Sequence, residues 1–511
     1  MKPRTSWPAG ALVLAAMWAV PAEGMARDVW VSTDGRAHND GTRAAPIDTL
    51  QNALRRAQPG DRVLVRAGVY PGGGWIDARG TAEAPITVVS ANGLHRAVME
   101  GGREGLRIGD RAAYLEFDGL EVRNAESNVV HIDGNAHHIT LRNVYAHDAG
   151  PNGDVLKVNQ ATNITVERSE FARPGLRPPG QGNPSQECID FVAVDGVIVR
   201  DSYIHDGGGN LLYAKGGSRG VIFERNVIAD QRAGASDPMV GLGAVTDRNL
   251  IQHGGAYEVY DAVFRNNIVM GGRVGGLAVY DGRNVNIVNN LFVDNDRVLV
   301  EFRAGNGSAA RSDGVRVTNN VFVDTRGQMP EVLRRPSHGL ENLTLSHNLF
   351  WNAGRPLPTT SLLDVAAQPG HLLADPRITL TPGDRQTLVR ALRCGAGSAA
   401  ETPGLDVSGE PYEVRTDIFG HERSGRYDRG PWNLAMPVPP PEPEPAPLFP
   451  FDDSPPDAGP ADAGAPPGDL ADDTGGCAVS PASPASSRTP WPGALLLLGL
   501  AATRLGRRRR A

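Results

Sequence analysis

A repeated pattern of short apolar runs between residues 100 and 355 limits how this chain can fold more than any other feature. Each repeat holds several runs of alternating apolar residues rich in Val, Ile and Phe, as in the segments at 268–270, 291–293 and 321–323. The base repeat is about 24 residues, a period typical of solenoid proteins. No helical spacing accompanies it, so the helical solenoids are excluded.

One turn residue precedes the third run of every repeat. Nine such positions align: Gly119, Asn143, Ser169, Ser202, Asn226, Asn267, Asn290, Asn320 and Asn348. Six of them are Asn, whose stacked side chains can hydrogen-bond from coil to coil and satisfy buried turn amides. We therefore predict an all-β fold, a right-handed parallel β-helix with three strands in each coil and an Asn ladder.

With this coil pattern, residues 28–433 resemble the pectate-lyase-like superfamily of right-handed β-helix proteins. The resemblance implies a helix that covers the N-terminal end of the solenoid and a polysaccharide as the molecule acted upon. Superfamily lyases commonly use a Lys or Arg base together with Ca²⁺. The chain carries no complete calcium-ligand motif of one named lyase family.

The composition and patterning of the sequence divide the chain into six predicted segments. Residues 1–26 predict a secretory signal peptide, because basic residues precede an apolar run and small residues. Residues 27–80 predict an N-terminal cap with first strands; Leu50, Ala53 and Leu54 recur at helical spacing after Thr49, a candidate helix cap. The β-helix spans 81–355 and a C-terminal cap spans 356–436. Residues 437–475 predict a disordered linker rich in Pro, Ala and Asp.

The last segment, residues 476–511, resembles the myxobacterial C-terminal sorting signal of the MYXO-CTERM type. It combines Cys477, a short apolar run and four terminal arginines at 507–510. The resemblance implies transient membrane association, cleavage near Cys477 by a sorting protease, and retention of a secreted protein at the outer cell surface. An ordinary transmembrane helix as a tail anchor is the alternative, although the run is short for a lasting span.

Charge and cysteine content exclude some partners. The net charge is −7 with a pI near 6.0, which offers no basic surface for nucleic acid. Three cysteines make no disulfide framework, and a bridge between Cys188 and Cys394 stays open. We expect a monomer.

Polar residues line up on the first strand of successive coils. His131, Lys157 and Asp190 each stand between apolar neighbours, so they are predicted to point outward in one column about 4.8 Å apart. We place Lys215 in the same column, with Ala214 facing inward, and continue the column past an insertion at 231–254 to Glu301.

Lysine usage singles out two members of this column. Of 51 basic residues only Lys2, Lys157 and Lys215 are lysines. Lys can lose its proton when neighbours lower its pKa, whereas Arg effectively cannot. Lys215 and Lys157 are therefore candidate general bases, with His131 as a third candidate for proton transfer.

Acids and other polar residues surround the column. We predict Asp154, Glu187 and Asp190 as oxygen ligands for Ca²⁺. Substrate contacts are assigned to outward positions: Asp133, Asn159, Tyr280, Glu301 and Arg303. Insertions at 173–186, 231–254 and 304–313 are placed at both edges of the sheet, where they would wall a groove.

The leading hypothesis is a lyase that cleaves a uronate-containing polysaccharide by β-elimination. Two alternatives remain open. A β-helix glycoside hydrolase would need paired carboxylic groups, for which Asp190 with Glu187 or Asp154 is the candidate set. A non-catalytic glycan-binding or adhesin-like surface protein would need only the groove, because fold does not decide function.

Overall fold

The computed structural model describes residues 26–176, 186–334, 339–358, 368–381, 383–423 and 425–449. All of them belong to the first of two compact units, residues 1–452. The predicted signal peptide up to residue 25, the predicted linker after residue 449 and the predicted sorting signal lie outside the described residues.

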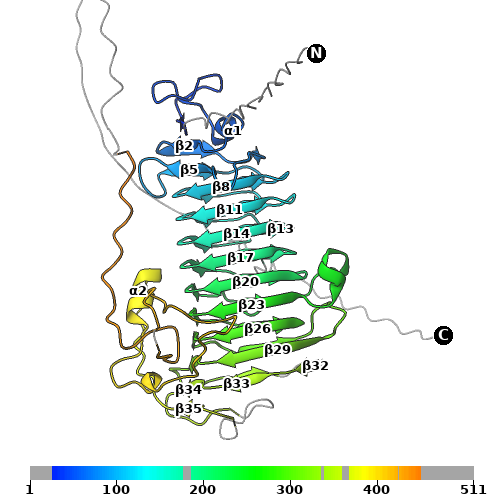
Figure 1. The fold of residues 1–511 in the computed structure, drawn as a ribbon, viewed down its shortest axis with the longest axis vertical. Coiled ribbons are helices and arrows are strands. Elements are labelled where there is room, and N and C mark those ends of the chain that lie inside the picture. Colours follow the sequence, from blue (N-terminus) through cyan, green and yellow to red (C-terminus); the bar gives the residue numbers. More distant parts are fainter. Residues whose placement is uncertain are drawn as a thin grey trace, which may run out of the picture. The chain divides into compact units, whose positions relative to one another are not determined.

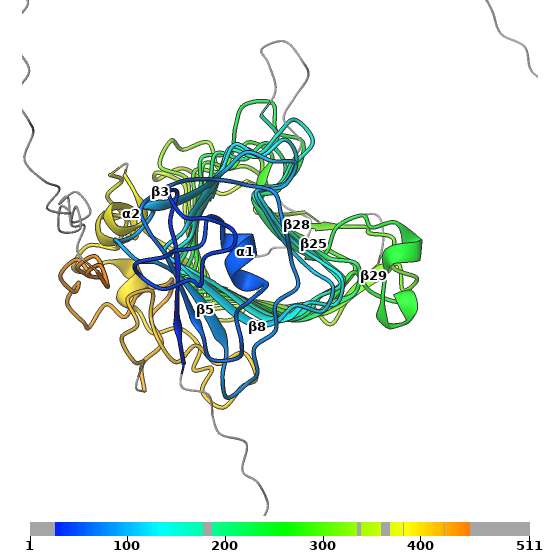
Figure 2. The same cartoon turned by 90° about the horizontal axis from the view of Figure 1, so that it is seen from above.

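Three parallel sheets wind around one core (Figures 1 and 2). Sheet A contains β1 Asp28–Val31, β2 Arg62–Val65, β5 Ile86–Ser90, β8 Ala113–Asp118, β11 His137–Arg142, β14 Thr162–Glu167, β17 Asp195–Arg200, β20 Ser218–Glu224, β23 Val259–Arg265, β26 Gly282–Val288, β29 Arg311–Thr318, β32 Gly339–Glu341 and β33 Thr344–Ser346. Sheet B contains β3 Gly68–Pro71, β6 Ala97–Glu100, β9 Glu121–Arg123, β12 Tyr145–His147, β15 Glu170–Ala172, β18 Tyr203–His205, β21 Val227–Ala229, β24 Ile268–Met270, β27 Leu291–Val293, β30 Val321–Val323, β34 Leu349–Trp351 and β35 Leu372–Leu373. Sheet C contains β4 Trp75–Ile76, β7 Leu106–Ile108, β10 Val130–Ile132, β13 Leu156–Asn159, β16 Ile189–Val192, β19 Leu212–Lys215, β22 Val240–Leu242, β25 Gly275–Tyr280, β28 Val298–Arg303 and β31 Leu333–Arg334.

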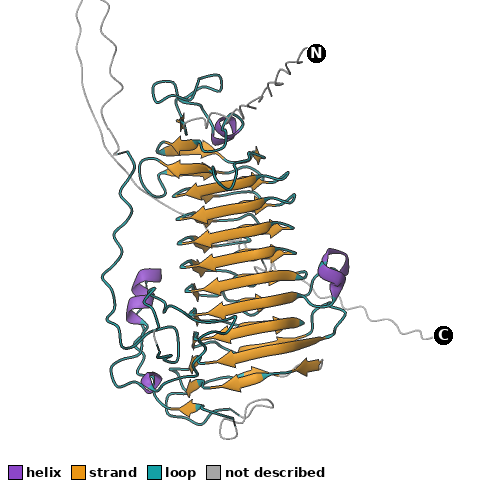
Figure 3. Cartoon of the chain, viewed as in Figure 1, coloured by secondary structure: helices purple, strands orange, loops and turns teal. Residues whose placement is uncertain are grey.

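The chain visits the sheets in the order C, A, B in each coil, so strands of one sheet pair with the preceding and following coils. Strand alternation supplies the core, as in β8, where every second residue is buried. Side chains of equivalent strands stack along the axis: the rings of Phe322 and Phe350 lie 5.3 Å apart and 9° from parallel. The result is the predicted three-strand coil (Figure 3).

The Asn ladder is present in the later coils. The Nδ2 group of Asn226 donates to Oδ1 of Asn267 at 3.1 Å, and the same bond links Asn267 to Asn290, Asn290 to Asn320 and Asn320 to Asn348. Each ladder oxygen also accepts the backbone N–H of the preceding ladder residue. The ladder therefore satisfies buried turn amides through five coils.

Two of the nine predicted ladder positions are wrong by one residue. Sheet B pairs Tyr145 with Glu121 and with Glu170, which places Val144 and not Asn143 beside Ser169. Gly119 and Asn143 instead have positive φ, at the turn position just before the ladder. Asn and Gly tolerate this left-handed conformation better than other residues, so turn residue and ladder residue look alike in sequence.

The predicted N-terminal helix is confirmed. Helix α1, Leu50–Leu54, begins after Thr49, whose Oγ1 accepts the N–H of Asn52 at 3.2 Å. Its residues Leu50, Ala53 and Leu54 are buried in the same core as the first coils. The helix thus covers apolar side chains that the first coil would otherwise leave in water.

The residues after the last coil pack on the outside of the solenoid. Helix α2, Arg385–Ala391, and the short 3₁₀ helix η3, Ala399–Glu401, contribute to a second apolar cluster with the outward side chains Val227 and Ala229 of β21. Residues 437–449 follow without helix or strand. The carbonyl oxygen of Pro439 accepts a hydrogen bond from the guanidinium of Arg390 at 2.5 Å. The ring of Phe449 lies 4.7 Å from the ring of Trp30 in β1.

Both cysteines of the solenoid are buried free thiols, so Cys188 and Cys394 are not bridged to each other. Among the residues with described positions, the helices are too short or too polar to cross a bilayer.

Candidate functional site

Sheet C carries an outward-facing row of residues in strict register. It consists of Trp75, Arg107, His131, Lys157, Asp190, Tyr213, Gly241, Ala278, Glu301 and Arg334, which we call the sheet C column. The predicted alignment of His131, Lys157 and Asp190 is confirmed, as is the later position of Glu301.

Lys215 is not in this column, contrary to the sequence prediction. It pairs with Val192, and Tyr213 takes the place beside Asp190. Ala214 faces inward, as predicted. Because side chains alternate along a strand, Tyr213 and Lys215 both face outward, and the prediction gave Lys215 the position that Tyr213 takes, two residues earlier. Lys215 still lies on the same face: its Nζ is 4.6 Å from the centre of the Tyr213 ring.

Residues 231–254 do not form a single loop before a strand of sheet C, which is a second difference from the prediction. It contains strand β22, whose Gly241 continues the sheet C column. Residues 230–239 lie at the edge where strands enter sheet C, and residues 243–258, with the short 3₁₀ helices η1 (Arg248–Leu250) and η2 (His253–Gly255), lie at the opposite edge. Both edges of sheet C therefore carry loops, as expected.

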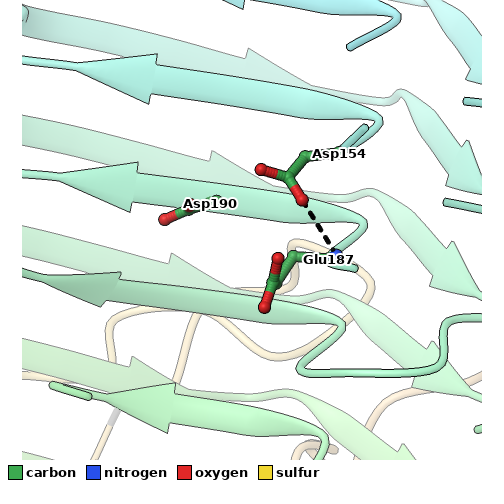
Figure 4. Close-up of side chains that lie close together, drawn as sticks. All are labelled: Asp154, Glu187 and Asp190. Carbon is green, nitrogen blue, oxygen red and sulfur yellow. Dashed lines mark hydrogen bonds between the residues drawn. The ribbon is translucent and has the colours of Figure 1, made fainter. Parts of the chain in front are cut away.

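Three carboxylates meet at the strand entrances of sheet C. One oxygen from each of Asp154, Glu187 and Asp190 lies within 4.8 Å of the others, and we call this set the acid cluster (Figure 4). The backbone N–H of Glu187 donates to Oδ1 of Asp154 at 3.1 Å. Asp190 is fully buried and Asp154 is 5% exposed. The three predicted ligands are thus brought together.

Lys157 reaches into the acid cluster. Its Nζ lies 3.3 Å from Oδ2 of Asp154 and bonds to Oδ2 of Asp190. The Lys157 ammonium therefore contacts two of the three carboxylates. Burial and the neighbouring Asp154 raise the pKa of Glu187 well above its ordinary value.

Lys215 stands in a half-buried position at the end of β19. Burial lowers its pKa below the ordinary value, although the nearby carboxylates of Glu187 and Asp154 act in the opposite direction. The ring of Tyr213, itself buried, lies beneath the ammonium. A lowered pKa increases the fraction of neutral amine, the form that can accept a proton.

A buried glutamate fixes the chain just after Lys215. Glu258 is fully buried and accepts from the N–H groups of Gly216 at 3.0 Å, Thr246 at 3.1 Å and Asn306 at 2.9 Å. These bonds tie the end of β19 to the two loops at that edge of the sheet. Sequence reasoning missed Glu258, because nothing near it in the chain marks it as more than a loop acid.

His131 is enclosed by polar partners. Its Nδ1 lies 2.7 Å from Oε1 of Glu104, and the side-chain amide of Asn159 lies 3.1 Å from its Nε2. An Nδ1–H that donates to Glu104 and an Nε2 that accepts from Asn159 satisfy both contacts. Asp133 pairs with Arg107 at 2.7 Å. Both ring nitrogens of His131 therefore have partners in the described protein.

At the other end of the column the predicted substrate contacts also engage one another. Arg303 donates to the hydroxyl of Tyr280 at 3.0 Å, and its Nε lies 2.9 Å from Glu301. Glu301 lies 3.5 Å from Arg334 as well. These groups form a charged, partly buried surface four strands beyond the acid cluster.

The acid cluster suits a hard divalent cation. Carboxylate oxygens are the ligands that Ca²⁺ prefers. Within the part of the chain that the structure describes, Oδ1 of Asp190 is buried without a hydrogen-bond partner, which is costly for a charged oxygen unless a cation faces it. Asp154, Glu187 and Asp190 could therefore hold such an ion.

Comparisons with known proteins agree with the architecture. A family model described as Pel9A-like, right handed beta helix region matches residues 29–171, and one described as right handed beta helix region matches residues 128–322. Together with the three parallel sheets, these matches confirm the predicted right-handed parallel β-helix.

Two curated relatives are similar over part of their length. "Pectate lyase PEL9" from Emericella nidulans is 27% identical over 214 residues, which cover 37% of this chain and 50% of that protein. "Pectate disaccharide-lyase" from Dickeya chrysanthemi is 25% identical over 319 residues, which cover 59% of this chain and 38% of that protein. This chain thus spans half or less of either relative. The crystal structure of pectate lyase Pel9A superimposes with a TM-score of 0.48 at 16% identity, over 80% of this chain and 96% of that one.

Proposed function

We propose, from the premise that the chain is a right-handed parallel β-helix protein, that it is a lyase which cleaves a uronate-containing polysaccharide by β-elimination. The observation that carries the proposal is the position of a half-buried lysine, Lys215, on the same face of sheet C as the acid cluster. The names of the two partial relatives support the same reaction class.

The acid cluster supplies the first requirement of the reaction. A uronate carries a negative charge beside the carbon that must lose a proton, and Ca²⁺ held by Asp154, Glu187 and Asp190 would neutralise that charge and make the proton more acidic. Substrate and cluster are both anionic, so a cation between them is also needed for binding.

Lys215 would act as the base. Its neutral amine takes the proton from the carbon next to the carboxylate, the electron pair forms a double bond to the neighbouring ring carbon, and the glycosidic oxygen leaves from that carbon. The leaving oxygen takes a proton from water and the Lys215 ammonium returns its proton to the solvent, so the products are an unsaturated uronide and a new chain end. Tyr213 and Glu258 hold Lys215 in place.

Lys157 is assigned a different role. It already forms ion pairs with Asp154 and Asp190. It therefore balances the acid cluster when no other cation is present. Asn159 and Asp133 remain proposed floor contacts of the substrate groove. His131, the third candidate for proton transfer, is given no such role because both of its ring nitrogens already have partners, Glu104 and Asn159.

The proposal includes secretion, action as a monomer and retention at the outer cell surface. The targeting assignments rest on residues 1–26 and 476–511, of which the structure describes only residue 26.

A panel of polyuronates tests the function. The full-length protein is incubated with pectate, alginate, chondroitin and heparan, each with Ca²⁺ or with EDTA, and the ultraviolet absorbance of unsaturated uronides is recorded. The proposal expects absorbance with at least one polymer and its loss in EDTA. New reducing ends without absorbance would indicate a hydrolase instead, and binding without either product would indicate a glycan-binding protein.

A further inference from the structure

An exposed tryptophan stands at the far end of the sheet C column. Trp75 in β4 is 40% exposed, whereas the other outward residues between it and the acid cluster are more enclosed. Strand β4 pairs in register with β7, and the same register continues from β7 through β10 and β13 to β16, so Trp75 and Asp190 are separated by four strand steps. Four steps correspond to roughly 19 Å along the sheet.

The surroundings hold the indole in one orientation. The guanidinium of Arg107, on the next strand, lies 4.7 Å from the ring centre. Arg107 is fixed in turn by ion pairs with Glu104 at 2.8 Å and Asp133 at 2.7 Å. One face of the ring is thus supported by an immobilised cation, which stabilises the aromatic side chain.

The backbone beside Trp75 leaves room for this orientation. A Cβ atom added at Gly109 would lie 3.0 Å from the ring carbons of Trp75 and 2.4 Å from Oδ1 of Asp133. A side chain at residue 109 would therefore push the indole aside by a few tenths of an ångström, which Gly avoids. The carbonyl of Trp75 also accepts from Nε2 of Gln51, in the capping helix α1, at 3.2 Å.

We infer that Trp75 is a distal subsite which stacks on a pyranose ring of the polymer whose cleavage point lies at the acid cluster. This inference rests on the proposed function. The ligand class is an extended acidic polysaccharide, and the contact is made by the apolar face of a sugar ring against the exposed indole.

The subsite makes binding depend on chain length. A polymer that lies along the column meets both the acid cluster and Trp75, whereas an oligosaccharide of two or three sugars at the cluster cannot reach the indole. The neighbouring acids Glu104 and Asp133 are balanced only in part by Arg107, so the contact relies on stacking rather than on charge.

Calorimetric binding with calcium chloride tests the inference in the full-length protein. The ligands are the polyuronate that yields unsaturated uronides in the panel, or polygalacturonate if none does, and its trisaccharide. Trp75→Ala should weaken polymer binding about fivefold and leave trisaccharide binding unchanged, because stacking of one ring is worth on the order of 1 kcal/mol. Trp75→Phe should keep most of the affinity.

Val69→Ala is the matched control, since Val69 is 54% exposed on β3, the strand just before β4, but lies in sheet B. Equal polymer affinity in Trp75→Ala and wild type would overturn the subsite and leave the lyase proposal intact. Tight polymer binding that requires Trp75 but yields no unsaturated product would uphold the subsite and overturn the lyase. A wild type that binds no polymer would overturn both.

Discussion

Two lysines of the solenoid differ in what surrounds each ammonium. Lys157 bonds directly to two carboxylates of the acid cluster, whereas Lys215 lies over the ring of Tyr213 at the opposite end of its strand. A divalent ion that binds the same carboxylates must displace Lys157. The two lysines therefore have opposite expected effects on calcium binding and on catalysis.

Replacing Lys157 by Met should tighten calcium binding. The ammonium competes with the ion for Asp154 and Asp190, and removing one competing charge is worth on the order of 1–2 kcal/mol, about tenfold in affinity. Calorimetric titration of the full-length protein measures the change. Thermal unfolding in EDTA should also show lower stability, because Asp190 loses its partner.

Asp190→Asn is the counterpart of that change and should weaken calcium binding at least tenfold, since it removes a ligand charge. Asp206→Asn, at the half-exposed edge of sheet B, should leave the affinity unchanged. If Lys157→Met instead abolished product formation at saturating calcium, Lys157 would be the base and the present assignment would be wrong.

At the scale of elements, the Asn ladder ends on a histidine. The backbone N–H of Asn348 donates to Nδ1 of His371 at 3.1 Å, and Nε2 of His371 lies 3.2 Å from Oε1 of Gln368. Nδ1 must therefore be unprotonated. Burial lowers the pKa of His371 to about 4.

This depressed pKa makes stability fall in mild acid. Because the unfolded chain protonates His371 near its ordinary pKa of about 6.5, the unfolded state binds more protons between about pH 6.5 and 4, and the free energy of unfolding falls as the pH decreases. At pH 5 the loss is about 2 kcal/mol at most. Urea unfolding at pH 7 and pH 5 measures it.

His371→Gln keeps a hydrogen-bond acceptor but does not titrate, so its free energy of unfolding should change less between the two pH values than that of the wild type. Parallel pH dependence in both proteins would show that another group controls acid stability.

Strand alternation predicted the coils and the outward position of Asp190 in the acid cluster, whereas the helical spacing of Leu50, Ala53 and Leu54 predicted the capping helix. The same alternation could not distinguish position 213 from 215, since both face outward, and this misplaced Lys215. Glu258 and Trp75 escaped notice because their roles depend on contacts between coils. Loop length, which varies from coil to coil, sets those contacts and has no periodic pattern.

At the scale of the whole described unit, residues 437–449 run from helix α2, on the side of the solenoid, to its N-terminal coils. The backbone N–H of Phe449 donates to the carbonyl of Ala91 at 3.0 Å, and Nδ2 of Asn92 donates to the Phe449 carbonyl at 3.2 Å. The Phe449 ring packs on Trp30 and lies 5.7 Å from the guanidinium of Arg43. One aromatic side chain thus anchors the return of the chain.

Phe449→Ala should release this segment. We expect faster protease cleavage within residues 437–449, followed by mass spectrometry, with little change in the melting temperature of the coils. Leu448→Ala, at a side chain that is 51% exposed, is the control and should keep the wild-type cleavage rate. Equal protection in both variants would mean that Phe449 does not anchor the segment.

The central claim is that Lys215 removes the proton while the acid cluster holds the cation. The most direct test is the initial rate of unsaturated uronide formation by wild type and Lys215→Ala on the responsive polymer, with calcium affinity measured on the same samples. The account predicts a fall of at least about 10²-fold in kcat with unchanged calcium affinity and unchanged folding. A Lys215→Ala variant that retains the wild-type rate would contradict it.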